Sequence, residues 1–279
     1  MKNKSIRISN ALVGSDIEVF VKNTVTGKII SAEGLIGGTK KEPLKLDRRG
    51  CALQEDNVMA EFNVNATNNP QDMYEDIVYV LNTLTSRLPE GFDIEIAASA
   101  IIPEEFLQTP QAQEIGCDPD FNAWMGCANI PPAIESLNGL RTCGGHIHIG
   151  YDNPTKTTSI ALIKALDLFL TLPSILKDTD SRRREVYGKA GAYRIKPYGV
   201  ELRTLSNFWI KDLESVKFVF NAVAKAINFV NEGRLLSINT SQRIVYAINM
   251  QDKEAANDLI KEFDVLTEEK TTAFIPVTF

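Results

Sequence analysis

The chain has 279 residues and a formal net charge of −6, and it is 44% apolar and 24% charged, which is typical of a globular protein. This acidic balance excludes the broad basic surface that nonspecific nucleic-acid binding requires, although a local basic pocket is compatible with it. No run of about 18 or more apolar residues is present, and residues 1–10 lack an apolar stretch, so we expect neither a membrane-spanning helix nor a secretory signal. We therefore expect a cytoplasmic protein without a membrane partner or a nucleic-acid partner.

The first third of the chain alternates polar and apolar residues. Residues 16–22 read DIEVFVK, which as a strand places the acids on one face and isoleucine and valine on the other. TVTGKII at 24–30, with a turn at Gly27, extends this prediction to a hairpin over 16–32. Glycines, a proline and basic residues predict a loop over 35–50.

Helices and further strands follow in an irregular order. Strands are predicted over 57–65, 92–102, 146–151 and 199–206, and helices over 70–88, 155–178, 212–230 and 252–263. This order lacks the regular alternation that produces a parallel sheet. We therefore predict an α+β fold, with a mainly antiparallel sheet and helices packed on one side of it.

The cysteines do not indicate a zinc site. No closely spaced pair occurs among Cys51, Cys117, Cys127 and Cys143. We interpret them as reduced and mostly buried side chains, as is usual in a cytosolic protein.

Polar residues are spaced two apart in four of the predicted strand segments, so that each pair shares one strand face. The pairs are Asp16 and Glu18, Glu61 and Asn63, His146 and His148, and Glu201 and Arg203. Each pair alone would also fit a solvated strand face. If the four strands share one sheet, however, they line a common basin that contains carboxylates, both histidines of the chain and a guanidinium group.

Such a basin is suited to a divalent cation and phosphate. Carboxylates with an imidazole are ligands that Mg²⁺ or Mn²⁺ accepts, and the absence of thiolates disfavours zinc. Crowded carboxylates repel one another, and a divalent cation removes that cost. Arginine forks beside such a cation would bind phosphate oxygens.

Basic residues gather in the segment 180–203, which runs into the last acid of this set. They are Arg182, Arg183, Arg184, Lys189, Arg194, Lys196 and Arg203. The segment can be a solvated surface loop, or a phosphate-binding segment whose three glycines let the backbone approach a ligand. GGTKKEP at 37–43, which contains Lys40, is a second candidate for phosphate contact. Neither a Walker A loop nor a Rossmann fingerprint is present.

Four segments in this order resemble a known superfamily. They are GSDIEVFV at 14–21, QEDNVMAEFNV at 54–64, TCGGHIHIG at 142–150 and YRIKPYGVELRTLS at 193–206. Together they resemble the carboxylate–amine ligases of the glutamine synthetase and glutamate–cysteine ligase superfamily, above all its phage-associated COOH–NH2 ligase (amidoligase) branch. The resemblance covers roughly residues 12–210.

The resemblance implies a single glutamine synthetase-like domain over residues 1–279. In that fold a curved antiparallel sheet binds ATP and Mg²⁺, with Mn²⁺ as an alternative, on its concave face, and helices pack on its convex side. A phage-encoded member would work in the host cytoplasm.

The resemblance also implies roles for individual residues. The metal ligands would be Asp16, Glu18, Glu61, His146 and Glu201. Arg194 would contact ATP phosphates, with Lys40, Lys189 and Arg184 as further candidates. Arg203 would face the phosphoryl group or the substrate carboxylate, Glu55 is a further candidate metal ligand, and His148 would lie nearer the substrate or nucleotide. Amide formation also needs a base for the incoming amine, and Glu55, Asp56 and His148 are candidates for it by their position alone.

The implied activity is ATP-dependent amide or isopeptide formation through an acyl phosphate, with small-molecule or peptide carboxylates and amines as substrates. Two alternatives stay open: a metal-dependent phosphotransferase or hydrolase that uses the same basin, and a non-catalytic binding protein. Substrate specificity is expected from residues 100–140, where Phe121 and Trp124 either wall the site or pack in the core. The segment 207–210 is expected to pack, and the oligomeric state is left open.

Overall fold

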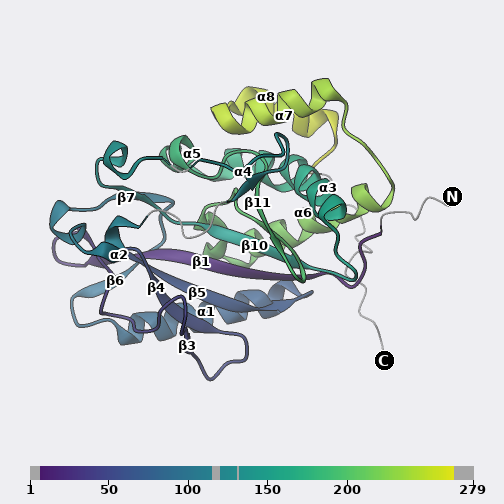
Figure 1. Ribbon diagram of the computed structural model, residues 1–279. Coiled ribbons are helices and arrows are strands. Elements are labelled where there is room, and N and C mark those ends of the chain that lie inside the picture. The colour runs from purple at the N-terminus through teal and green to yellow at the C-terminus, as the bar shows by residue number, and fades with distance from the viewer. Residues whose placement is uncertain (1–6, 115–119, 131, 267–279) are drawn as a thin grey trace.

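The computed structural model describes residues 7–114, 120–130 and 132–266 and has one large antiparallel sheet (Figure 1). The strand order is β3-β4-β5-β1-β10-β12-β11-β8, with β2 and β6 also paired to β1. The strand bounds are β1 (Leu12–Asn23), β2 (Ile29–Ile30), β3 (Leu44–Lys45), β4 (Ala52–Asp56), β5 (Met59–Thr67), β6 (Phe92–Glu95), β8 (Phe121–Asn122), β10 (Gly145–Gly150), β11 (Ala192–Lys196) and β12 (Gly199–Leu202). A separate ribbon pairs β7 (Ser99–Ile101) with β9 (Leu140–Thr142).

Helices occupy the segments between and after these strands. Their bounds are α1 (Pro70–Arg87), α2 (Pro110–Gln113), α3 (Lys156–Leu166), α4 (Leu172–Lys177), α5 (Arg182–Val186), α6 (Leu213–Asn231), α7 (Ile238–Met250) and α8 (Lys253–Glu262), with short 3-10 turns at Glu104–Phe106, Ile134–Leu137 and Asn207–Lys211. The long helices begin at side-chain caps. Asn69, Thr155 and Asp212 each accept a hydrogen bond from an amide of the first turn of α1, α3 and α6 respectively.

The side chains of strand β1 alternate between the apolar core on one face of the sheet and the polar cavity on the other. Ile17, Val19 and Val21 are fully buried in the main core, whereas Asp16 and Glu18 point to the opposite face. The core residues of α1, α3 and α6 pack against the same apolar face of the sheet. Helices α7 and α8 pack outside this layer, against α4 (Figure 1). The polar face is thereby left free to form a cavity.

The predicted α+β class and the antiparallel sheet are confirmed, and so is the hairpin formed by β1 and β2. The prediction of a single strand over 92–102 is wrong, because this segment forms two strands. Strand β6 pairs with β1 in the main sheet, and β7 pairs with β9 in the separate ribbon. Helices α2, α5 and α7 and strands β3, β4, β8, β9 and β11 were not predicted, and the short strand β3 lies within the predicted loop over 35–50. Among the cysteines, Cys51 and Cys143 are free and buried and Cys127 is free and exposed, while Cys117 lies outside the described residues.

The predicted helix over 155–178 is one continuous helical segment with a π-helical turn at Asp167–Thr171. By length and composition alone, the helical segment over residues 156–177 is apolar enough to cross a membrane, which our sequence expectation did not include. The expectation rested on unbroken apolar runs, whereas this segment stays apolar on average although charged residues interrupt it. In its most apolar window, 78% of the residues are buried inside the protein, as in a core helix.

The π-helical turn buries an ionisable group. Asp167 is fully buried, and its Oδ2 accepts a hydrogen bond of 2.6 Å from Trp124 Nε1. Burial raises the pKa of Asp167 to about 6, against the opposing effect of its hydrogen bonds. The fold therefore favours the protonated carboxyl group, and ionisation of Asp167 destabilises the folded chain.

We predict that this group makes the chain less stable as the pH rises from about 4 through about 6. The folded pKa lies about 2 above the unfolded one, which corresponds to about 3 kcal/mol in the free energy of unfolding. Asp167→Asn removes this loss, so the stability of the variant relative to the native chain should increase over that pH range. Urea unfolding at pH 4, 5, 6 and 7 measures the difference. The exposed Asp258→Asn is the control, and a pH-independent difference for Asp167→Asn would contradict the prediction.

Candidate functional site

The register of five neighbouring strands brings the predicted polar residues together. Because β5, β1, β10, β12 and β11 are adjacent and antiparallel, side chains that face the same side line up across the sheet. The directly opposed pairs are Asp16 with His146, Glu18 with Glu61, His148 with Glu201, and Arg194 with Glu201. The predicted common basin thus exists, although its residues are far apart in the sequence, from Asp16 on β1 to Glu201 on β12.

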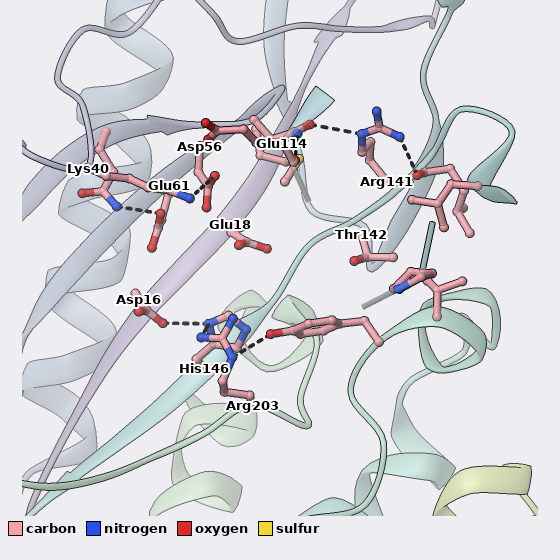
Figure 2. A pocket seen from close by; sticks show the side chains of 18 of the residues that line it. Asp16, Glu18, Lys40, Asp56, Glu61, Glu114, Arg141, Thr142, His146 and Arg203 are labelled. Atoms are coloured by element: carbon pink, nitrogen blue, oxygen red, sulfur yellow. Dashed lines mark hydrogen bonds and ion pairs between the residues drawn. The ribbon is translucent and has the colours of Figure 1, made fainter. Parts of the chain in front are cut away.

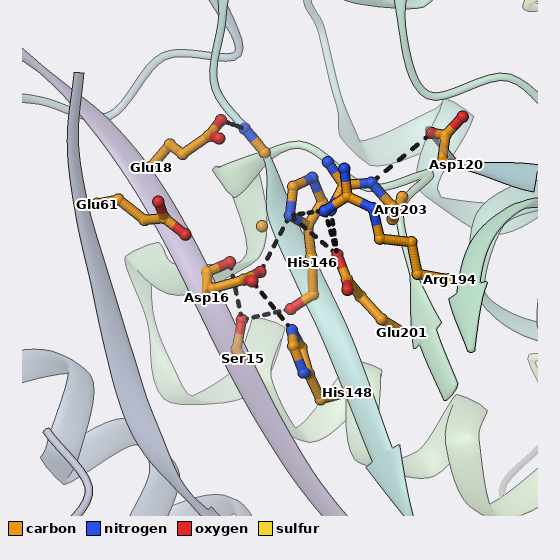
Figure 3. A network of polar contacts seen from close by, with 12 residues as sticks. Ser15, Asp16, Glu18, Glu61, Asp120, His146, His148, Arg194, Glu201 and Arg203 are labelled. Carbon is orange, nitrogen blue, oxygen red and sulfur yellow. Dashed lines mark hydrogen bonds and ion pairs between the residues drawn. The ribbon is translucent and has the colours of Figure 1, made fainter. Parts of the chain in front are cut away.

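Asp16 lies between the two histidines (Figure 3). Its Oδ1 is 3.0 Å from His146 Nδ1, and its Oδ2 is 3.1 Å from His148 Nε2. His148 Nδ1 is 2.5 Å from the hydroxyl group of Tyr198. Burial alone would raise the pKa of Asp16, but the charges and hydrogen bonds of the histidines outweigh it and hold that pKa well below its usual range.

Glu201 is fully buried and is surrounded by cationic side chains. It forms a close ion pair with Arg203, its Oε2 is 2.7 Å from Lys196 Nζ, and Arg194 Nη1 is 3.9 Å from Oε1. Burial would raise the pKa of Glu201, but the guanidinium of Arg203 lowers it. Ligand atoms of Asp16, His146 and Glu201 all lie within 4.8 Å of one another, a spacing suitable for one metal ion.

Glu18 and Glu61 form an anionic pair beside this triad. Glu61 accepts a hydrogen bond of 2.6 Å from Gln54, and Glu18 Oε2 accepts one of 2.5 Å from the amide of Gly144. Burial raises the pKa of both carboxyl groups, and the charges of Asp16 and Glu18 raise that of Glu61 further, well above its usual range. A cation between these carboxylates would reverse that effect.

A cavity of about 290 Å³ lies on this polar face (Figure 2). The main sheet supplies its acidic wall, and strand β9 with the end of α5 supplies the opposite wall. The lining residues are Asp16, Glu18, Lys40, Gln54, Asp56, Asn57, Met59, Glu61, Glu114, Pro132, Leu137, Leu140, Arg141, Thr142, His146, Val186, Tyr187, Arg194 and Arg203.

Five predicted site residues do not line this cavity. Glu201 and His148 lie beside it, in contact with lining residues Arg203 and Asp16 respectively, and the other three are Glu55, Arg184 and Lys189. Glu55 lies on the same strand as Asp56 but points away, because its carboxylate accepts hydrogen bonds from the amides of Gly34, Ile36 and Gly37. Arg184 is buried and donates to the carbonyl of Gly188, and Lys189 is partly buried. Lys40 does reach the cavity, where Nζ is 2.5 Å from Asp56 Oδ1.

Several contact residues were not assigned a role from the sequence. Lys196 follows Arg194 by two positions on β11, so strand periodicity was a usable signal for it. Tyr187 accepts a hydrogen bond of 2.6 Å from Arg203 Nε, and Asp120 Oδ2 lies 3.6 Å from the same atom. The approach of these two residues depends on long-range packing, and no local pattern indicated it.

The aromatic candidates mostly pack. Trp124 donates to Asp167 and has Lys164 Nζ 5.2 Å from its ring centroid, and it does not line the cavity, so the core alternative holds for it. Phe121 is 44% exposed and contacts the ring of Tyr193. Trp209 of the 207–210 segment is fully buried and donates to the carbonyl of Gly145, which confirms the packing prediction.

A comparison with family models matches residues 137–263 to the family described as phage phiEco32-like COOH.NH2 ligase-type 2. This match, over somewhat less than half of the chain, confirms the resemblance that the sequence motifs predicted. The matched range includes both histidines, Arg194, Glu201 and Arg203, but not the acids of β1 and β5.

Among solved structures, a bifunctional glutathione synthetase from Pasteurella multocida is similar, with a TM-score of 0.45 and 10% sequence identity. The alignment covers 95% of this chain and 50% of that one, so the chain spans about half the length of that protein. No curated protein sequence matches the chain.

We predict that Gly144→Ala weakens Mn²⁺ binding roughly tenfold or more. A Cβ at this position would lie 2.4 Å from His146 Nε2, so the imidazole would have to move away from Asp16 and Glu201. Calorimetric titration with Mn²⁺ measures the change. Gly150→Ala on the same strand is the control, since its Cβ would approach no atom closer than 3.6 Å. Equal Mn²⁺ affinity in the two variants would contradict a role for the imidazole.

Proposed function

We propose that this chain is an ATP- and Mg²⁺-dependent carboxylate–amine ligase that forms an amide or isopeptide bond through an acyl phosphate. The observation that carries the proposal is the convergence of Asp16, His146 and Glu201, next to a cavity that Arg194 and Arg203 line. The family match over residues 137–263 supports the reaction class. A single glutamine synthetase-like domain in the cytoplasm is the arrangement we propose for it.

The donor set fits a divalent metal ion. Asp16, Glu18, Glu61, His146 and Glu201 would hold it, because four carboxylates and one imidazole match Mg²⁺ or Mn²⁺ better than zinc. The raised pKa values of Glu18 and Glu61 support this assignment, since burial and neighbouring carboxylates disfavour their ionisation and a bound cation would offset both effects. The bound ion would supply charge neutralisation at the phosphate oxygens of ATP.

Arginine side chains of the chain would stabilise the transferring phosphoryl group. Burial opposes the charge of Arg203, but Tyr187 and Glu201 keep its pKa above the usual value, so the guanidinium stays fully charged. Arg194, on the neighbouring strand, lines the same cavity. In this proposal both groups neutralise negative charge as a substrate carboxylate oxygen attacks the γ-phosphorus and ADP leaves.

The second step joins the amine to the activated acyl group. The amine nitrogen attacks the acyl carbon, the bond to the phosphate oxygen breaks, and inorganic phosphate leaves. One proton of the amine must pass to a base. We propose Asp56 for this role, because it lines the cavity while Glu55 binds backbone amides elsewhere and His148 contacts Asp16 and Tyr198.

A metal-dependent phosphotransferase or hydrolase is the second candidate, because the same acids and arginines would serve any phosphoryl transfer. We predict that ADP formation by the native chain requires both a carboxylate and an amine. The measurement is a coupled ADP assay over a panel of carboxylates and amines with Mg²⁺, in which each component is omitted in turn. Full ADP formation without any amine would favour the phosphotransferase or hydrolase.

We predict that Glu201→Gln and His146→Ala each lower the rate of ADP formation roughly 100-fold or more, because both side chains contact the reacting region. The glutamine preserves the volume of the buried side chain while removing its charge. Thermal unfolding checks that each variant is folded, and the exposed Glu214→Gln on α6 is the control. Full activity in both folded variants would remove the metal-assisted mechanism.

A further inference from the structure

Arg141 is a buried cation in the wall of the cavity. It belongs to β9, is 6% exposed and lines the cavity together with Thr142 and Asn57. Its Nε donates to Asn57 Oδ1 at 3.1 Å, Nη1 to the carbonyl of Leu140 at 3.0 Å, and Nη2 to the carbonyl of Ala112 at 2.9 Å. These bonds fix the guanidinium plane without neutralising its charge, since all three acceptors are uncharged.

Among the described residues, no carboxylate forms an ion pair with Arg141, whereas Arg203, equally buried, contacts both Glu201 and Asp120. Burial lowers the pKa of Arg141, and no acidic neighbour opposes that change. A buried charge without a counter-charge is costly. A guanidinium has five N–H groups, of which these bonds use three, so two donors are left for an anion.

Arg141 lies across the cavity from Asp16, His146 and Arg203, with Glu18 between the two sides (Figure 2). We propose that Arg141 binds a carboxylate of a substrate that is not consumed in the reaction. This inference rests on the proposed function and narrows it: one of the two co-substrates is an amino acid, a peptide with a free carboxyl terminus, or a dicarboxylic acid.

The surroundings of Arg141 favour a carboxylate over a second phosphate. Glu18, Asp56 and Glu114 line the same cavity, and their charges repel a dianion more strongly than a monoanion. A planar carboxylate accepts two parallel hydrogen bonds from a guanidinium. Leu137 and Leu140 line the same cavity and offer it apolar surface, as the carbon chain of an organic acid would need.

The acids nearby also favour a zwitterion. Glu114 lines the cavity on the same side as Asn57, which donates to the Glu114 carbonyl. An ammonium group near Glu114 or Asp56 would offset the repulsion that a lone carboxylate meets there. We therefore expect free amino acids and peptides to bind better than dicarboxylic acids that lack an amine.

The test is calorimetric titration of the native chain with the standard L-amino acids, their α-methyl esters and glutarate, with Mg²⁺ and a non-hydrolysable ATP analogue present. At least one free acid is expected to bind roughly tenfold or more tightly than its ester, because the ester has lost the charge that pairs with the guanidinium. In Arg141→Gln this preference should disappear, and in Arg141→Lys, which keeps the charge but not the fork, part of it should remain.

Arg243→Gln on α7 is the matched control, since Arg243 pairs with Glu262 on the molecular surface and should leave the preference intact. Thermal unfolding and affinity for the ATP analogue show whether Arg141→Gln is folded. If Arg141→Gln does not fold, the proposal is tested by comparing the affinities for free acid and ester in the native chain with those in Arg141→Lys.

The inference is overturned if no free acid binds the native chain better than its ester, or if folded Arg141→Gln keeps the preference. The two proposals can fail separately. An Arg141-dependent preference without ADP formation would remove the ligase function and keep the carboxylate subsite. ADP formation that does not change in Arg141→Gln would remove the carboxylate subsite and keep the ligase function.

Discussion

The antiparallel pairing of β1 with β10 is the constraint on which the site depends. It sets Asp16 opposite His146, and the neighbouring pairings set Glu61 opposite Glu18 on one side and Glu201 opposite His148 on the other. A shift of one residue in this register would turn the acids into the apolar core. The buried valines and isoleucines on the other face of β1 oppose such a shift, so the core that stabilises the fold also fixes the chemistry.

Charge compensation divides the polar face of the sheet into two distinct regions. On the β12 side, Glu201 is neutralised by Arg203 and Lys196, and its carboxylate stays ionised. On the β5 side, burial raises the pKa of both Glu18 and Glu61, and the charges of Asp16 and Glu18 raise that of Glu61 further. The fold therefore crowds carboxyl groups at one point and buries the Arg141 guanidinium among uncharged acceptors at another. Both are features that a bound cation and a bound anion would correct.

Strand periodicity made much of this predictable from the sequence. Residues two apart must share a strand face, so the pairing of Asp16 with Glu18 and of His146 with His148 followed directly from spacing. The position of Glu55 did not follow, because Asp56 next to it faces the opposite way and only the fold decides which of them reaches the cavity. Arg141 and Tyr187 lie on segments without a recognisable motif, and their approach to the site results from tertiary packing.

The long sequence separation between the paired strands affects how the protein folds. Asp16 and His146 stand 130 residues apart, and Glu201 joins them only after β12 has been synthesised. A nascent chain that has completed β1 and β5 therefore exposes a row of acids with no partners, beside an apolar face that awaits α6. Sheets whose strands pair over such long sequence separations fold slowly. A divalent cation that binds the acids of β1 and β5 before β12 has paired would therefore affect the folding rate as well as the folded protein.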